Sequence, residues 1–356
     1  MLLKNLYNQE YISLLCSSLN MSELDEENFV KNIFNSQWKN KELKERMRHI
    51  TTTLYDFLPH KYKDAIEILK LGFSKLNHSY SLENIIFQDY VEVFGLDEFE
   101  ISMDALEYFT NKSSSEFAIR QFILKHTDDT IAQMHIWADS DNHHVRRLAS
   151  EGCRPRLPWA IALNEFKKNP SEILLILEKL KDDKSEYVRK SVANNINDIS
   201  KDNPEIVKDL ANSWIGHNKN RDSLLKHGCR TLLKAGDKES LSLFGFNKPD
   251  LLELKNFKIS SSVEMGKELE FSFLLNSKNK LGKLRIEYAI SFLRKNGTHN
   301  KKVFKVSEGI FTENKRLISK KHSFRPISTR VYYKGQHKLA IIINGVIFAE
   351  KEFILS

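Results

Sequence analysis

The spacing of apolar residues changes from a period of about 3.6 to a period of 2 near residue 254. Before this point the apolar residues recur at helical intervals, as in the segment from Leu43 to Leu58, which ends at Pro59. Beyond it apolar and polar residues alternate, as in Leu269–Leu275. The sequence therefore predicts an all-helical domain over residues 1–254 and an all-β domain over residues 257–356.

The helical part contains an internal repeat. The segment DNHHVRRLAS, with Val145-Arg146, is echoed by KSEYVRKSVA, with Val188-Arg189, and more faintly by SLLKHGCRTL. A polar turn followed by Val-Arg at the start of a helix is typical of HEAT-like helix pairs, which stack into an α-α superhelix with a concave surface. Unrelated amphipathic helices are the alternative that these segments leave open.

The second part carries the signals of an immunoglobulin-like β-sandwich. Asn344-Gly345 lies between two apolar runs, and this dipeptide tolerates the positive φ angles of a type I′ hairpin turn. About seven strands are expected in this part, which suits such a sandwich. Without a Cys–Trp–Cys set, an antibody-type domain is excluded.

Charge is distributed unevenly along the chain. Residues 257–356 contain 15 Lys and 5 Arg against 8 acidic residues, a net charge of +12, whereas the whole chain carries +8. Residues 1–110 carry 11 basic and 18 acidic residues. This asymmetry suggests a polyanionic partner for the β part, although a charge that merely keeps the domain in solution is the alternative.

Several classes of protein are excluded by what the sequence lacks. No apolar run reaches the roughly 20 residues that span a bilayer, and the first residues do not resemble a secretion signal, so we expect a cytoplasmic protein without a membrane partner. Cys16, Cys153 and Cys229 are isolated, which indicates reduced thiols. No glycine-rich phosphate loop or paired Cys/His cluster is present, so we expect no metal, no nucleotide and no other cofactor.

The run VRRLASEGCRPRLPWA, residues 145–160, is the most informative segment for chemistry. A glycine and two prolines interrupt a predicted helix there, close to Glu151, Arg154, Arg156 and Trp159. A carboxylate, two guanidinium groups and an indole can stabilise a cation, bind phosphates and form an aromatic wall. A buried structural ion pair between Glu151 and an arginine explains the same residues equally well.

Two other segments contribute candidate residues. SSSEFAIRQF contains Glu116 and Phe117, although Ser-Ser-Ser-Glu is also typical of a helix N-cap. Asp198, in SVANNINDISKDNP, comes at the end of a predicted repeat helix, a position where a solvated aspartate is common.

Together these segments resemble the AlkC branch of the DNA alkylation repair glycosylases, in the AlkC/AlkD superfamily of HEAT-like repeats. The resemblance rests on SSEFAIRQF, VRRLASEGCRPRLPWA, VRKSVANNINDISKDNPEIV and LLKHGCRTLLKAGD, and it covers residues 100–240 most closely. A trailing immunoglobulin-like domain also occurs in some AlkC proteins. Cys153 stands where another small residue is expected, which affects none of the proposed roles.

The resemblance implies a monofunctional glycosylase of base excision repair. Such an enzyme hydrolyses the N-glycosidic bond of 3-methyladenine and 3-methylcytosine in double-stranded alkylated DNA, without deep base flipping, and we expect it to be a monomer. By position, Glu116, Glu151 and Asp198 would be the active-site carboxylates. Trp159, with Phe117, would be the aromatic wall against the lesion.

Phosphate contacts are expected from basic residues in or beside the turns that open the repeats, namely Arg147, Arg154, Arg156, Lys226, His227 and Arg230. The alternative function is a non-catalytic HEAT-repeat module that binds DNA or a protein. Carboxylates at the matching positions favour the enzyme, because a phosphate binder gains nothing from a glutamate beside its ligand.

Overall fold

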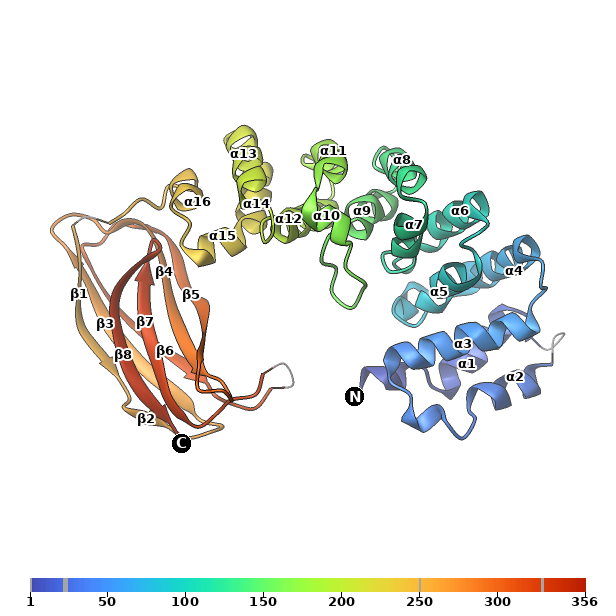
Figure 1. The fold of residues 1–356 in the computed structure, drawn as a ribbon, viewed down its shortest axis with the longest axis horizontal. Coiled ribbons are helices and arrows are strands. Elements are labelled where there is room, and N and C mark those ends of the chain that lie inside the picture. The colour runs from blue at the N-terminus through green and yellow to red at the C-terminus, as the bar shows by residue number, and fades with distance from the viewer. Residues whose placement is uncertain (1, 22–24, 250, 328–329) are drawn as a thin grey trace. The chain divides into compact units, whose positions relative to one another are not determined.

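The computed structural model describes residues 2–21, 25–249, 251–327 and 330–356. Helices occupy the chain up to Leu243, and strands occupy it from Leu252 onward (Figure 1). The predicted fold class, a helical repeat array followed by an immunoglobulin-like sandwich, is confirmed.

The first half of the helical array contains short 3-10 turns between longer α-helices. Its elements are η1 Leu3–Leu6, α1 Gln9–Ser18, α2 Glu26–Ile33, η3 Trp38–Asn40, α3 Leu43–Phe57, α4 Tyr62–Lys75, η4 His78–Tyr80, α5 Ile85–Phe94 and α6 Phe99–Phe109. The predicted helix before Pro59 is α3. A reciprocal capping box between Glu42 and Glu45 starts this helix, and it ends at Phe57.

The second half of the array carries the internal repeat. Its helices are α7 Ile119–Lys125, α8 Thr127–Trp137, α9 His143–Gly152, α10 Asn164–Lys168, α11 Ser171–Leu180, α12 Glu186–Ile199, α13 Pro204–Trp214, α14 Lys219–Gly228, α15 Arg230–Ala235 and α16 Lys238–Leu243. α9 packs against α12, and α12 packs against α14, while α11 contacts both α9 and α12.

Two repeat-opening arginines share one local geometry. Arg146 donates hydrogen bonds to the carbonyls of Ser140 and Asp141, and Arg189 donates to those of Asp183 and Lys184. Each guanidinium therefore caps the carbonyls six and five residues before it, in the turn ahead of its own helix. The two segments have the same structure as well as a similar sequence, which supports a true repeat over unrelated helices.

The β part is a two-layered sandwich. Its strands are β1 Leu252–Ile259, β2 Ser262–Val263, β3 Glu268–Ser277, β4 Gly282–Leu293, β5 His299–Phe311, β6 Lys315–Ser323, β7 Gly335–Ile343 and β8 Val346–Leu355. One sheet has the order β1-β3-β6 and the other β2-β8-β7-β4-β5. Neighbouring strands are antiparallel, except for the short pairing of β2 with β8.

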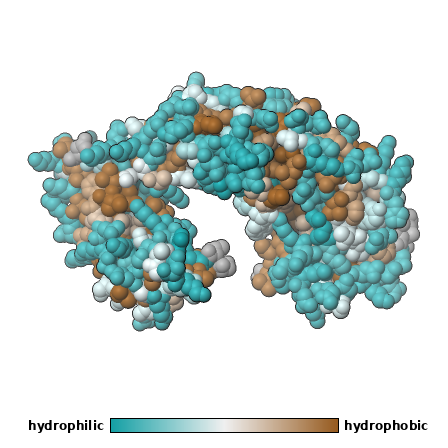
Figure 2. All heavy atoms as spheres, viewed as in Figure 1, coloured by the Kyte–Doolittle hydropathy of each residue, from teal (hydrophilic) through white to brown (hydrophobic). Residues whose placement is uncertain are grey.

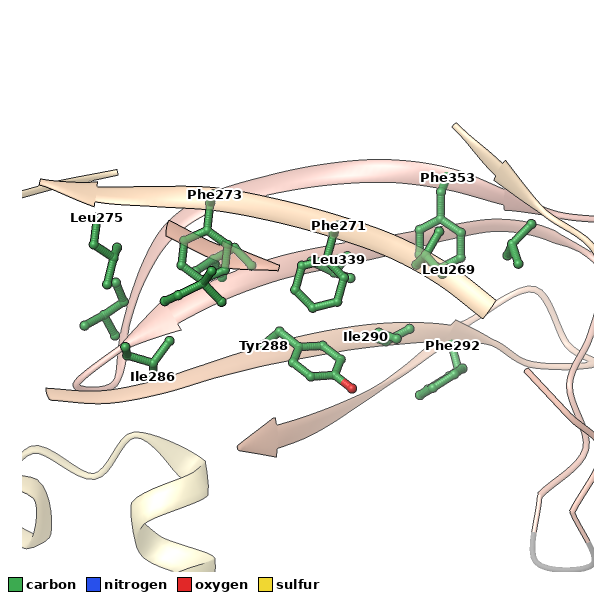
Figure 3. Close-up of a cluster of buried hydrophobic side chains, with 14 of the residues drawn as sticks. Leu269, Phe271, Phe273, Leu275, Ile286, Tyr288, Ile290, Phe292, Leu339 and Phe353 are labelled. Atoms are coloured by element: carbon green, nitrogen blue, oxygen red, sulfur yellow. The ribbon is translucent and has the colours of Figure 1, made fainter. Parts of the chain in front are cut away.

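The core of the sandwich follows from the period of 2. Leu269, Phe271 and Phe273 are buried on one face of β3, and they point toward β4 in the facing sheet, where Ile286, Tyr288 and Ile290 point back at them (Figure 3). The alternate residues of β3 face outward. Figure 2 shows hydrophilic side chains over most of the visible surface of both the helices and the sandwich.

The predicted hairpin at Asn344-Gly345 is confirmed. Asn344 has φ of 47° and Gly345 has φ of 78°, as a type I′ turn requires, and the turn joins β7 to β8. The Asn344 side chain donates to the carbonyls of Asn247 and Lys283, so the turn also anchors the segment that follows α16.

The chain divides into two compact units. One comprises residues 1–207 and 214–228, and the other comprises residues 208–213 and 229–356. α15 and α16 therefore belong to the compact unit that holds the strands, although the change from helix to strand comes only between Leu243 and Leu252. No helix in the described ranges is both long and apolar enough to cross a membrane.

Candidate active site

We call the compact unit of residues 1–207 and 214–228 the helical unit. A cavity of about 620 Å³ lies in this unit. Six of the residues predicted from the sequence line it, namely Glu116, Phe117, Arg147, Glu151, Arg154 and Trp159. Further lining residues include Tyr187, His144, His78, Lys112 and Ser114. The wall thus combines two carboxylates, two guanidinium groups and several aromatic rings.

The charged groups of this site form one continuous chain of ion pairs, which we call the ion-pair network. Arg147 lies 2.5 Å from Glu116 and 3.4 Å from Glu151, and Arg154 lies 2.5 Å from Glu151 and 2.8 Å from Asp198. The network therefore alternates strictly between acid and base. It contains Glu116, Arg147, Glu151, Arg154 and Asp198.

Helix geometry explains how the network forms. Arg147 and Glu151 are four residues apart on α9, so both side chains lie on the same face of the helix. α9 ends at Gly152, and the chain turns at once, which brings the Arg154 guanidinium back onto Glu151. Asp198 comes from the last turn of α12, which packs beside α9.

Three charged residues of the ion-pair network are almost completely buried. Glu151 is 4% exposed, Arg154 is 6% exposed and Asp198 is 1% exposed. Burial lowers the pKa of Arg154, but the charges and hydrogen bonds of Glu151 and Asp198 outweigh that effect and hold the pKa above its usual value. Arg147 follows the same pattern, with Glu116 as its strongest charge partner. Both guanidinium groups are therefore permanent cations beside the carboxylates of the site.

Each of the two cavity-lining carboxylates uses one oxygen for these contacts. Glu116 is held through Oε2, which contacts Arg147 and the Ser114 hydroxyl, and Glu151 is held through Oε1. An ionised oxygen beside a cavity can stabilise a positive charge or accept a proton from water.

The structure decides the alternatives that the sequence left open for the carboxylates. The segment of residues 113–116 is not the N-cap of α7, because α7 begins only at Ile119 and no side chain in the described ranges caps it; the Ser114 hydroxyl accepts a hydrogen bond from the Glu116 amide in the preceding turn. Asp198 is buried, so the expectation of a solvated aspartate is wrong. Glu151 is both a member of a buried ion pair and a wall of the cavity.

Trp159 lies in the loop between α9 and α10, which we call the 153–163 loop. Its φ is +64°, in the left-handed region, and its side chain is 62% exposed. A bulky residue in this region costs about 1–2 kcal/mol relative to an extended conformation. Such strain persists only where the surrounding contacts impose it, and it is common at functional sites.

The predicted phosphate-binding residues fall into three groups. The guanidinium groups of Arg147 and Arg154 pair with the carboxylates of the ion-pair network. These pairs favour a role in positioning the carboxylates and not a role in binding phosphate. Arg156 is partly exposed and makes a two-pronged pair with Asp202. These predicted phosphate contacts stay predictions.

The third group comes from the segment around α14. Lys226 is half-buried, and His227 is exposed, with its imidazole 3.0 Å from the Asn194 side-chain oxygen. Arg230 is half-buried and belongs to the other compact unit. None of these three lines the cavity described above.

Sequence reasoning missed several residues around the cavity. His144 and Tyr187 occupy the same position of successive repeats, directly before Val145 and Val188, so the repeat register could have identified both as candidates for the same site. Tyr187 also stacks with Arg147, whose guanidinium carbon lies 4.9 Å from the ring centroid.

Arg120 and Lys44 were also missed as parts of the site. Arg120 is fully buried and donates to the carbonyls of Gly152, Arg154 and Ile161. Burial lowers its pKa to about 10. Lys44 contacts the 153–163 loop from α3. No local sequence signal distinguishes Lys44, because its partner is 115 residues away.

Two family models match the chain. The model described as DNA alkylation repair enzyme matches residues 87–229. The model described as the C-terminal Ig-like domain of the uncharacterised protein YhaZ matches residues 253–356.

Two individual proteins are similar to the chain along its length. The uncharacterized protein YhaZ of Bacillus subtilis (strain 168) is 43% identical over 355 residues, which are 99% of this chain and 98% of that protein. The alkylpurine DNA glycosylase AlkC of Pseudomonas fluorescens, solved bound to DNA containing an abasic site analog, is 34% identical. Its structure matches with a TM-score of 0.94, and the match covers 100% of both chains.

Proposed function

Because the chain belongs to the AlkC-type family of DNA alkylation repair enzymes, we propose that it is a monofunctional DNA glycosylase that releases 3-methyladenine and 3-methylcytosine from double-stranded alkylated DNA. The observation that carries the proposal is the ion-pair network, which presents two carboxylates to a cavity beside an exposed tryptophan. We propose further that the protein acts as a monomer in the cytoplasm.

The chemistry of the lesion suits a site without a strong general acid. A base methylated at N3 is already cationic, so it can leave with the electron pair of the glycosidic bond and become neutral without a proton. The main barrier is then the formation of an oxocarbenium-like sugar. Preorganised negative charge beside that sugar lowers this barrier.

Glu116 and Glu151 are the residues proposed for these roles. One carboxylate stabilises the positive charge at the sugar C1′, and the other accepts a proton from the attacking water as its oxygen bonds to C1′. The products are the free base and an abasic site. Asp198 is proposed as the third carboxylate of the site, and its ion pair with Arg154 supports a contribution through that guanidinium.

The aromatic residues supply selectivity for a cationic base. The face of an indole attracts a cation, by about 1–2 kcal/mol when the pair is partly desolvated, and a neutral base gains much less. Trp159 is proposed for this contact because its indole is exposed on the rim of the cavity, and Phe117 is proposed to extend the same wall.

Binding to DNA is proposed to involve the basic residues of both units. The strand-containing part, with its net charge of +12, provides a sequence-independent attraction to phosphates. Arg156 and the segment around Lys226, His227 and Arg230 are the proposed local contacts on the helices, with Arg147 and Arg154 available only if their pairs rearrange.

The proposal is tested by a base-release assay on a duplex with one defined lesion. Purified protein with EDTA present should release free 3-methyladenine or 3-methylcytosine from such a duplex, measured by chromatography, and leave the undamaged duplex intact. If neither lesion yields base above background while the duplex is bound, the protein is a binding module instead.

Glu151→Gln tests the role of the carboxylate. This change keeps the shape of the side chain but removes its charge, so base release should fall by about 10²–10³-fold while affinity for the duplex stays nearly constant. Glu165→Gln, on the exposed helix α10, is the matched control and should leave the rate unchanged. Loss of the folded state in Glu151→Gln would show that the residue is purely structural.

A further inference from the structure

The position of Trp159 depends on contacts that its own loop does not supply. The residue is in the left-handed region, and its indole projects into solvent. Hydrogen bonds within the loop involve the Ala160 amide with the Leu157 carbonyl and the Leu163 amide with the Pro155 carbonyl. These bonds close the turn on either side of Trp159 but do not involve its own carbonyl.

Arg120 holds the 153–163 loop from the inside. Its buried guanidinium donates at 2.7 Å to the Ile161 carbonyl, at 2.9 Å to that of Gly152 and at 2.8 Å to that of Arg154. These bonds anchor the two ends of the loop. The tip of the loop, from Arg156 to Ala160, includes Trp159, whose carbonyl accepts none of these bonds.

Lys44 supports the tip from the outside. Its ammonium group donates a hydrogen bond to the Trp159 carbonyl, and the same nitrogen lies 4.8 Å from the centroid of the Phe117 ring. Lys44 of α3 therefore contacts both aromatic residues that we propose to contact the lesion. It contacts Trp159 through the backbone carbonyl and Phe117 through the ring. Phe117 lines both the main cavity and a second one of about 500 Å³, which Lys44, Lys41 and Arg48 also line.

The helix that carries Lys44 is itself well anchored. Arg48, one turn further along α3, forms a two-pronged pair with the buried Asp89 of α5 and also contacts Glu92. Lys44 therefore projects from a rigid element, and its ammonium group can hold the loop tip in place.

We propose that Lys44 is a positioning residue that holds Trp159 in its left-handed conformation and keeps Phe117 beside it, so that the two rings form one preorganised wall. This role rests on the proposed glycosylase function. Lys44 touches the wall and not the reacting atoms. Its removal should therefore slow the chemical step, because a displaced ring no longer fits the cationic base.

The motion of Trp159 can be measured in the full chain without DNA. The chain has four tryptophans, and the other three, Trp38, Trp137 and Trp214, are at most 8% exposed. The fast component of the tryptophan anisotropy decay should therefore belong to Trp159, and its loss in Trp159→Phe identifies it. Lys44→Met should increase this component, whereas Lys44→Arg, which keeps a donor and a cation, should restore the wild-type decay.

Lys41→Met is the matched control, since Lys41 lines the same second cavity but makes no side-chain contact with the loop among the contacts seen in the described ranges. An anisotropy decay that is the same in Lys44→Met and in wild type overturns the proposal. This readout does not require activity, so it decides the role of Lys44 even if the wild-type protein releases no base.

A second measurement links the position of the ring to the reaction. Under single-turnover conditions Lys44→Met should release methylated base about ten-fold more slowly, with duplex affinity within a factor of about two of wild type and with recovery in Lys44→Arg. A loss of duplex affinity with unchanged Trp159 motion would make Lys44 a phosphate contact and overturn the proposal. An unchanged rate with a mobile Trp159 would equally overturn the role in catalysis.

Discussion

Arg154 and Arg156 are two residues apart in one loop, yet their surroundings differ. Arg154 is buried between Glu151 and Asp198, and Arg156 pairs with Asp202 at the surface. A buried charge that loses its partner is costly, whereas a surface pair contributes little. Two arginines in one loop therefore have different physical roles: Arg154 belongs to a buried network and Arg156 to a surface ion pair.

The difference predicts effects of very different size on the free energy of unfolding for two matched substitutions. Arg154→Met should lower the free energy of unfolding by about 3 kcal/mol, because Glu151 and Asp198 stay buried and, among the described residues, keep only their ion pairs with Arg147 and Lys201. Arg156→Met should change it by less than about 1 kcal/mol. Urea unfolding followed by tryptophan fluorescence reports the helical unit, since all four tryptophans lie in residues 38–214. Equal effects of the two changes would contradict the network as a buried unit.

At the scale of elements, the close approach of helices positions the site. Gly152 is the last residue of α9, and the sequence suggested that it breaks the helix. The structure gives it another role. A Cβ atom at this position would lie 2.6 Å from Ile119 Cγ2 of α7 and 3.1 Å from Met134 Cε of α8. Only glycine lets α9 pack this closely, and this packing places Glu151 against the cavity.

Gly152→Ala should therefore destabilise the helical unit by about 1–3 kcal/mol through overpacking, despite the higher helix propensity of alanine. Ile119→Ala removes the Cγ2 atom that a Cβ at position 152 would meet. The double variant should consequently be more stable than the sum of the two single effects predicts, by about 1 kcal/mol or more. Strict additivity in urea unfolding experiments would show that Gly152 has no packing role.

At the scale of the whole molecule, charge and chemistry are divided between the parts of the chain. The ion-pair network lies in the helical unit, whereas the net charge of +12 lies in residues 257–356. Such a division suits an enzyme whose affinity for DNA and whose reaction depend on different residues.

A chain ending at Gly228, where the described compact units divide, tests this division. Its duplex affinity should be lower and should depend less steeply on salt, because each lost phosphate contact reduces the slope of log K against log salt by about 0.9. Fluorescence anisotropy of a labelled duplex measures the slope, and circular dichroism checks that the helices remain folded. An unchanged slope would show that the strand-containing unit does not contact DNA.

The sequence by itself determined the local structure of this protein. The apolar periods predicted helices and strands, Asn344-Gly345 predicted the type I′ hairpin, and the Val-Arg segments predicted the repeat. These signals are readable because they arise from backbone preferences and from the burial of one face of a helix or strand, which involve residues close together in the chain.

Only the tertiary structure decided how the candidate residues are connected. The resemblance supplied Glu116, Glu151 and Asp198, but their alternation with two arginines depends on the turn before α7 and the end of α12 both lying against α9. The contact between Lys44 and Trp159 likewise joins residues 115 positions apart. Contacts of this kind leave no periodic trace in the sequence, because each depends on helix packing and on the burial of single side chains.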